Sequence, residues 1–147
     1  MIDRFERFSL AIAEISRHWH KITADEMERY GLKGAHAVYL TALARHPEGI
    51  TAPRLRELCG RDKADVSRSL ALMEEKGLVT RENRYRGLFQ LTPEGRAAAE
   101  HVRRRASLAV ELAGSDLTDE NRAIFYESLE TITAKLREIS KEGLPDT

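Results

Sequence analysis

Two amphipathic stripes, one near each end of the chain, limit the available folds more than any other feature of the sequence. The N-terminal stripe has apolar residues at alternating spacings of 3 and 4: Phe5, Phe8, Ile12, Ile15, Trp19 and Ile22. The C-terminal stripe repeats the alternation: Phe125, Leu129, Ile132, Leu136 and Ile139. This spacing places the side chains on one face of a helix, so the sequence predicts a long α-helix at each end.

The two stripes also predict a homodimer. The segment between them must bury a core of its own, so the simplest use of both stripes is to pair with each other and with a second copy across a two-fold axis. At 147 residues the chain fits one domain. We assign residues 1–30 and 110–141 to dimerisation helices, with Thr118 as an N-cap, and residues 31–109 to the part between them. The interface is expected to use the apolar residues of the two stripes, from Phe5 to Trp19 and from Phe125 to Ile139.

The middle of the chain predicts two helices joined by a tight turn. An apolar segment, residues 35–43, precedes a turn at residues 46–49. Thr51 can then cap a helix that ends at Gly60, and Asp62, with Asp65 three residues later as in a capping box, can cap a second helix that ends near Gly77.

A β-hairpin and a further helix are predicted next. Two short apolar runs, residues 78–80 and 88–91, flank a polar connection, and Thr92 and Pro93 then restart a helix. Helix, turn, helix and hairpin is the order of a winged helix-turn-helix, whose second helix enters the DNA major groove. We therefore predict a mainly α fold with a small β-hairpin wing, flanked by the long terminal helices.

The second helix of the motif has a face suited to DNA. Helical periodicity places Val66, Leu70 and Met73 on the side that packs on the first helix. The opposite side carries small residues and one arginine: Ala64, Ser67, Arg68, Ala71 and Glu75. Arg68 can therefore reach a base edge, most naturally guanine by a bidentate contact.

The charge distribution agrees with DNA binding by the middle of the chain. The net charge is zero, yet residues 51–90 hold nine basic and six acidic side chains, whereas residues 111–147 hold four basic and nine acidic ones. Lys63 and the first-turn amides can take a phosphate. The expected DNA-binding residues are Thr51, Arg54, Asp62, Lys63, Ala64, Asp65, Ser67, Arg68, Arg81, Arg84 and Arg86.

Residues 49–100 resemble the MarR family of winged-helix transcriptional regulators, and the flanking helices extend the likeness over nearly the whole chain. Its most specific pieces are residues 66–68 (VSR), 76–79 (KGLV) and 91–96 (LTPEGR). The resemblance implies a homodimer on a pseudo-palindromic double-stranded operator, acting most often as a repressor. It also implies a small aromatic effector in a cleft between the dimerisation and DNA-binding parts.

The chain departs from the family pattern at three places. The wing is short and lacks an Asp-x-Arg-Arg pattern, so the sequence does not choose between Arg84 and Arg86 for the minor groove. Ala71 and Leu72 replace residues that are commonly polar. Asp65 stands where Ser or Thr is usual, where it would either accept from a cytosine amino group or repel a phosphate.

The remaining features favour neither an enzyme nor a membrane protein. The sequence has no Gly-rich phosphate loop, nucleophile motif or coupled carboxylate pair, and no apolar run long enough to span a bilayer. We expect no enzymatic activity, no cofactor, no membrane partner and a cytoplasmic location.

Two features leave alternative functions open. Cys59, the single cysteine, is expected in the core, with a redox role as the minor alternative, and the five histidines show no metal-ligand spacing. The alternative functions are a metal- or redox-responsive regulator of the same fold and a winged-helix protein-interaction module without DNA binding.

Overall fold

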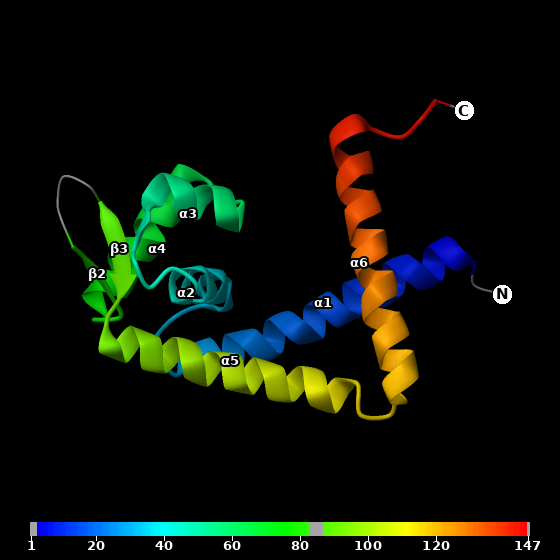
Figure 1. Cartoon of the computed structure of the whole chain (residues 1–147), viewed down its shortest axis with the longest axis horizontal. Coiled ribbons are helices and arrows are strands. Elements are labelled where there is room, and N and C mark those ends of the chain that lie inside the picture. The colour runs from blue at the N-terminus through cyan, green and yellow to red at the C-terminus, as the bar shows by residue number, and fades with distance from the viewer. Residues whose placement is uncertain (1–2, 83–86, 147) are drawn as a thin grey trace. The chain divides into compact units, whose positions relative to one another are not determined.

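The computed structural model of the chain describes residues 3–82 and 87–146 (Figure 1). It divides into two compact units, Met1–Ser107 and Leu108–Thr147. The first contains most of the elements and the entire core; the second contains the end of one helix and all of the last.

The first unit begins with α1 (Arg4–Glu28), which confirms the predicted N-terminal helix. The Asp3 side chain caps it by accepting from the Glu6 amide at 2.8 Å. The helix continues beyond the apolar stripe to Met27, which is fully buried. A short 3₁₀ turn, η1 (Gly34–His36), then leads into α2 (Ala37–Ala44).

The two motif helices, α3 (Ala52–Cys59) and α4 (Lys63–Glu75), form where the capping residues predict them. The Thr51 hydroxyl accepts from the Arg54 amide at 3.3 Å, and the Asp62 carboxylate accepts from the Asp65 amide at 2.7 Å. Gly60 ends α3 with φ of 61°, a left-handed conformation that glycine adopts without steric cost.

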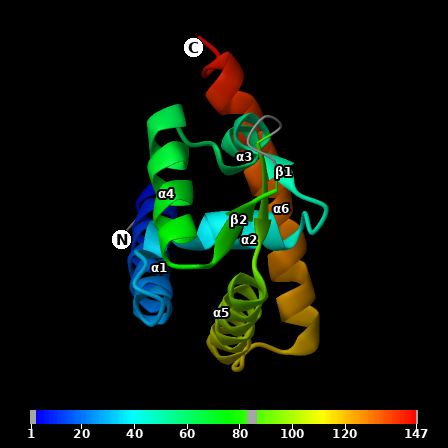
Figure 2. The same cartoon turned by 90° about the vertical axis from the view of Figure 1, so that its left-hand side faces the viewer.

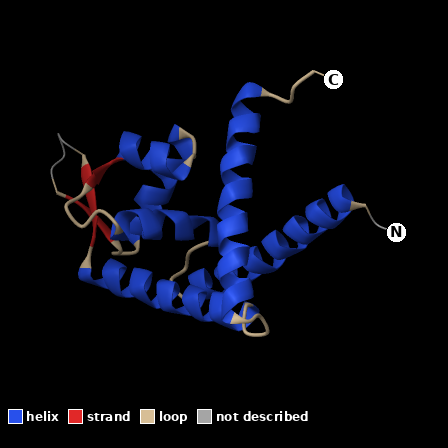
Figure 3. Ribbon diagram, turned by 45° about the vertical axis from the view of Figure 1, so that its right-hand side comes forward, coloured by secondary structure: helices blue, strands red, loops and turns tan. Residues whose placement is uncertain are grey.

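The predicted hairpin is confirmed as part of a larger sheet. Strands β2 (Val79–Arg81) and β3 (Leu88–Leu91) pair antiparallel, and β1 (Ile50–Thr51) pairs on the other side of β3, which gives the order β1-β3-β2. The strands are red in Figure 3. The register places Ile50 opposite Phe89 and Val79 opposite Leu91. The sequence did not predict β1, because two residues carry no measurable periodicity.

One hydrophobic core holds the first unit together. It joins residues from every helix and strand of that unit apart from the short η1, with fully or almost fully buried side chains at its centre: Met27, Tyr39, Leu40, Leu43, Leu55, Val66 and Met73. The core therefore fixes α4 through one face and leaves the opposite face free.

The start of α5 (Pro93–Ala113) is joined closely to the entry of the hairpin. The Thr92 amide donates to the Leu78 carbonyl at 3.0 Å, and the Thr92 hydroxyl donates to the Gly77 carbonyl at 2.6 Å. The same hydroxyl oxygen accepts from the Gly95 amide at 3.0 Å. A side chain at Gly95 would meet the Leu78 carbonyl oxygen, so this junction requires glycine.

The second unit contains the last residues of α5 and all of α6 (Asp119–Glu142). Thr118 caps α6 by accepting from the Asn121 amide at 3.1 Å, as predicted. The Arg122 guanidinium closes the turn before it by donating to the carbonyls of Gly114 at 2.8 Å and Leu117 at 3.0 Å. None of residues 108–146 is buried, so this unit has no core of its own.

Candidate nucleic-acid interface

Helix α4 buries one face and exposes the other, as its sequence predicts. Val66, Ser69, Leu70 and Met73 are buried in the first unit. The opposite residues are all exposed: Ala64, Ser67, Arg68, Ala71 and Glu75. We call these five the recognition face. In Figure 2, α4 runs along the edge of the first unit, with the sheet on one side of it.

Arg68 is the one cation of the recognition face. Small side chains, Ala64 and Ala71, stand one turn to either side of it along the helix. They would let a flat molecule approach the helix backbone closely, while Arg68 extends five N–H donors outward. The arrangement suits a guanine edge, which offers two acceptors in the major groove.

The N-terminus of α4 is partly occupied by the chain itself. The Asp62 carboxylate accepts from the Asp65 amide, so a phosphate at this end would have to use the remaining first-turn amides and the exposed Lys63. Asp62 and Lys63 thus lie at the helix end where the sequence predicted phosphate contacts.

Asp65 lies at the border between the buried and exposed faces of α4. Its Oδ2 accepts a hydrogen bond from the Tyr39 hydroxyl of α2, so its carboxylate is held by the chain itself. The sequence placed Tyr39 only in an apolar segment and gave no signal of this contact, because the two residues are 26 positions apart.

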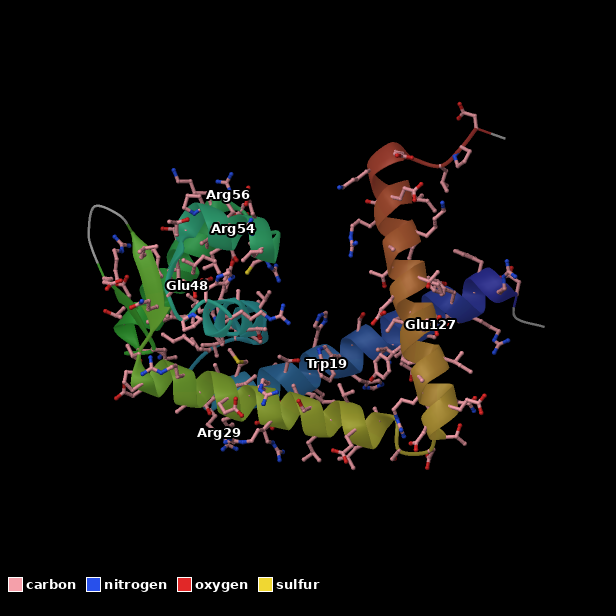
Figure 4. All side chains as sticks on the ribbon, viewed as in Figure 1. Trp19, Arg29, Glu48, Arg54, Arg56 and Glu127 are labelled. Carbon is pink, nitrogen blue, oxygen red and sulfur yellow. The ribbon has the colours of Figure 1, made fainter. Side chains whose placement is uncertain are left out.

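Helix α3 adds a second basic surface. Arg54 and Arg56 lie on its outer side (Figure 4), and the Arg54 guanidinium donates to the Glu57 carboxylate at 2.8 Å. This exposed ion pair is worth at most about 1 kcal/mol, so a phosphate could compete with Glu57 for Arg54. Thr51 was also predicted to contact DNA. Its hydroxyl oxygen accepts a hydrogen bond from the Arg54 amide.

The wing arginines fall into two groups. The guanidinium of Arg81 lies 4.6 Å from the centre of the Phe89 ring, and its Nη2 is 3.9 Å from Glu74 Oε1. Arg81 therefore lies at the last position of β2, next to the connection between the strands, and its guanidinium lies between Phe89 of β3 and Glu74 near the end of α4. Arg84 and Arg86 lie outside the described residues.

Cys59 has the surroundings of a core residue. It is half-buried at the end of α3, with its Sγ 3.9 Å from the Val38 carbonyl oxygen. Burial raises the pKa of the Cys59 thiol, and the nearby Arg61 opposes this only in part. A raised pKa favours the protonated thiol, the less nucleophilic form.

Residues 3–82 and 87–146 contain neither a cluster of metal ligands nor a helix that could span a membrane. No three histidine, cysteine, aspartate or glutamate side chains in these ranges come together as a metal site would require. No helix in the same ranges is both long and apolar enough to cross a bilayer.

Both apolar stripes are exposed on the single chain. The N-terminal stripe ranges from 36% exposed at Trp19 to 75% at Phe5. On α6, Phe125, Leu129, Ile132 and Leu136 are exposed and Ile139 is half-buried. Large apolar surfaces of this kind mark association sites.

Comparison with known proteins identifies relatives of this architecture. Residues 30–86 match the model of the MarR family. No curated protein has a significantly similar sequence. A MarR transcriptional regulator from Methanosarcina mazei Go1 shares 25% identity over 93% of each chain, with a TM-score of 0.80.

Two further solved structures share the fold at lower identity. MepR, a regulator of the Staphylococcus aureus multidrug efflux pump MepA, has a TM-score of 0.72 at 20% identity over 88% of this chain and 98% of its own. CouR from Rhodococcus jostii RHA1, bound to p-coumaroyl-CoA, has a TM-score of 0.70 at 19% identity over 85% and 90%. The predicted winged helix-turn-helix fold is confirmed by these likenesses and by the sheet and helices described above.

Proposed function

We propose that this chain, which belongs to the MarR family of transcriptional regulators, binds a pseudo-palindromic DNA operator as a homodimer and acts as a ligand-responsive repressor in the cytoplasm. The observation that carries the proposal is the recognition face of α4. It exposes Arg68 between two alanines while the reverse face of the same helix is buried in the core. A helix held in this way can enter a major groove without rearranging the fold.

The chemistry of each side chain at the recognition face and the start of α4 determines which part of the DNA it is proposed to contact. Arg68 reads a guanine, with Ala64 and Ser67 against the neighbouring base edges. Lys63, Arg54 and the free amides at the start of α4 take phosphates, which position the protein without reading sequence. Asp62 contributes by capping α4.

The homodimer places two recognition faces on one duplex. Its support is the exposure of both stripes and the lack of a buried residue among residues 108–146. A 40-residue segment without a core gains its stability by covering its apolar side chains with a second copy. Two-fold symmetry in the protein then requires a pseudo-palindromic operator.

A small aromatic effector that releases the operator is part of the proposal. Its support is CouR, a structural neighbour bound to p-coumaroyl-CoA. An effector can release DNA only if it binds the DNA-incompetent state more tightly than the DNA-bound state.

Arg68→Ala should relax base preference at one position of each half-site and cost about 1–3 kcal/mol of operator binding, because the bidentate guanine contact is lost. Selection from a random duplex library, followed by fluorescence anisotropy on the selected sequence, measures both effects. Arg137→Ala, which removes the same charge from the exposed surface of α6, is the matched control and should leave preference unchanged. Unaltered base preference in Arg68→Ala would show that α4 does not read the sequence.

Arg84→Ala and Arg86→Ala should weaken binding to all duplexes alike. Each removes one cation from a wing predicted to grip the backbone, so the slope of log K against log salt should fall by about 0.9 per lost phosphate contact. Titration of one selected and one scrambled duplex across a range of salt concentrations measures the slope. A loss of base preference without a change in slope would contradict the backbone role.

A further inference from the structure

We propose that Tyr39, a residue of the buried core, sets base preference by fixing the Asp65 carboxylate at the edge of the recognition face. The inference rests on the proposed function, since it concerns which base α4 reads. It assigns Asp65 to an exocyclic amino group, that of cytosine, and gives Tyr39 the role of a positioning residue.

Tyr39 joins α2 to two successive turns of α4. Its side chain is fully buried, and its hydroxyl donates to Asp65 Oδ2. The side chain of Ser69, one turn further along α4, lies near the same hydroxyl and opposes the rise in the pKa of Tyr39. Ser69 is itself only 3% exposed, so water is excluded from this side of the Tyr39 hydroxyl.

The tyrosine remains a donor at every physiological pH. Burial, followed by the hydrogen bond to Asp65, raises the pKa of Tyr39 to about 12. The neutral phenol therefore persists, and the Asp65 carboxylate keeps its partner.

Asp65 is held through both its main chain and its side chain. Its main-chain amide donates to the Asp62 carboxylate at 2.7 Å, and its Oδ2 is taken by Tyr39. Rotation of the carboxylate would break a hydrogen bond to a buried donor, which is costly because that donor would be left without a partner.

The position of Asp65 brings it within reach of bases. Three residues turn a helix through about 300°, so Asp65 lies about 60° around α4 from Arg68. It is partly exposed there, beside the recognition face. A carboxylate can only accept hydrogen bonds. The major groove offers amino donors on both cytosine and adenine, but the adenine donor lies beside the N7 acceptor of the same base, so a carboxylate is better matched to cytosine.

A fixed acceptor discriminates between bases better than a mobile one. If Asp65 could rotate, it could turn away from a mismatched base and the penalty for that base would fall. The hydrogen bond to Tyr39 prevents this rotation. A base without an amino group then places an acceptor opposite the carboxylate, and the two acceptors repel each other. Tyr39 thus acts on specificity through Asp65.

The test is selection from a random duplex library with four proteins: the unchanged protein, Tyr39→Phe, Asp65→Asn and Ser69→Ala. The unchanged protein should prefer cytosine at one position per half-site, distinct from the guanine read by Arg68. Asp65→Asn keeps an oxygen for Tyr39 but adds donors, so preference at that position should change to adenine. Tyr39→Phe keeps the carboxylate but frees it, so discrimination there should fall about tenfold. Ser69→Ala leaves the Tyr39–Asp65 bond in place and should change nothing at that position.

Several results would overturn the inference. A Tyr39→Phe protein that keeps its cytosine preference, or loses preference equally at all positions, would show that Tyr39 has only a structural role. An Asp65→Asn protein with unaltered preference would show that Asp65 reads no base, a result that holds even if Tyr39→Phe does not fold. Failure of the unchanged protein to select any duplex would instead contradict the proposed function itself.

Discussion

Leu129→Asp should convert the protein to a monomer and lower its affinity for the operator at least about 100-fold, because the avidity of two linked half-sites is lost. Leu129 lies at the centre of the α6 stripe and is 37% exposed on the single chain. In the proposed dimer its side chain is covered by the partner, and a carboxylate there would be buried without a counter-charge. Sedimentation equilibrium measures the mass, and fluorescence anisotropy measures the affinity.

Thr131→Asp is the matched control for this experiment. Thr131 lies on the opposite side of α6, about 200° from Leu129, and is exposed. The same charge at this position should leave the dimer and its affinity unchanged. A dimeric Leu129→Asp protein with full affinity would exclude the α6 stripe from the interface.

Gly95→Ala should destabilise the first unit by about 3 kcal/mol or more, since overpacking against rigid backbone has no inexpensive relief. A Cβ at this position would lie 2.0 Å from the Leu78 carbonyl oxygen and 2.9 Å from its carbon. That oxygen also accepts from the Thr92 amide, so moving it would break the junction between α5 and the wing. Denaturant unfolding followed by circular dichroism measures the loss.

Gly114→Ala provides the comparison for Gly95. A Cβ at Gly114 would meet Arg122 Nε at 3.4 Å and the Val110 carbonyl oxygen at 3.6 Å, which are ordinary contact distances. Gly114→Ala should change the free energy of unfolding by no more than about 1 kcal/mol. If Gly95→Ala were equally mild, the start of α5 would not lie in close contact with the Leu78 carbonyl at the entry of the hairpin.

Local chemistry made much of the fold predictable. The caps at Thr51, Asp62 and Thr118 and the stop at Gly60 each depend on interactions within three or four residues, so the sequence placed the helix ends correctly. The recognition face followed from helical periodicity alone, because one side of α4 is uniformly apolar.

Long-range pairing was not predictable in the same way. Strand β1 exists because Ile50 pairs with Phe89, 39 positions away along the chain, and no local pattern marks it. The same holds for the bond from Tyr39 to Asp65.

The position of Arg81 within the wing depends on the pairing of the two strands. The sequence grouped Arg81 with Arg84 and Arg86 as wing cations. The register places Arg81 opposite Phe89 within the sheet, and its guanidinium lies over that ring. Whether a cation stands on a strand or at a tip depends on the hairpin register, which the sequence alone did not fix.

Guanine methylation interference on the selected operator measures whether each subunit of a dimer reads one guanine in the major groove through Arg68. A methyl group on N7 removes the acceptor that Arg68 requires. We predict interference at one guanine per half-site, symmetric about the operator centre and separated by about 10 base pairs or a multiple of that spacing. The Arg68→Ala protein should be insensitive to both modifications. Binding unaffected by N7 methylation, or interference within a single half-site only, would contradict the account.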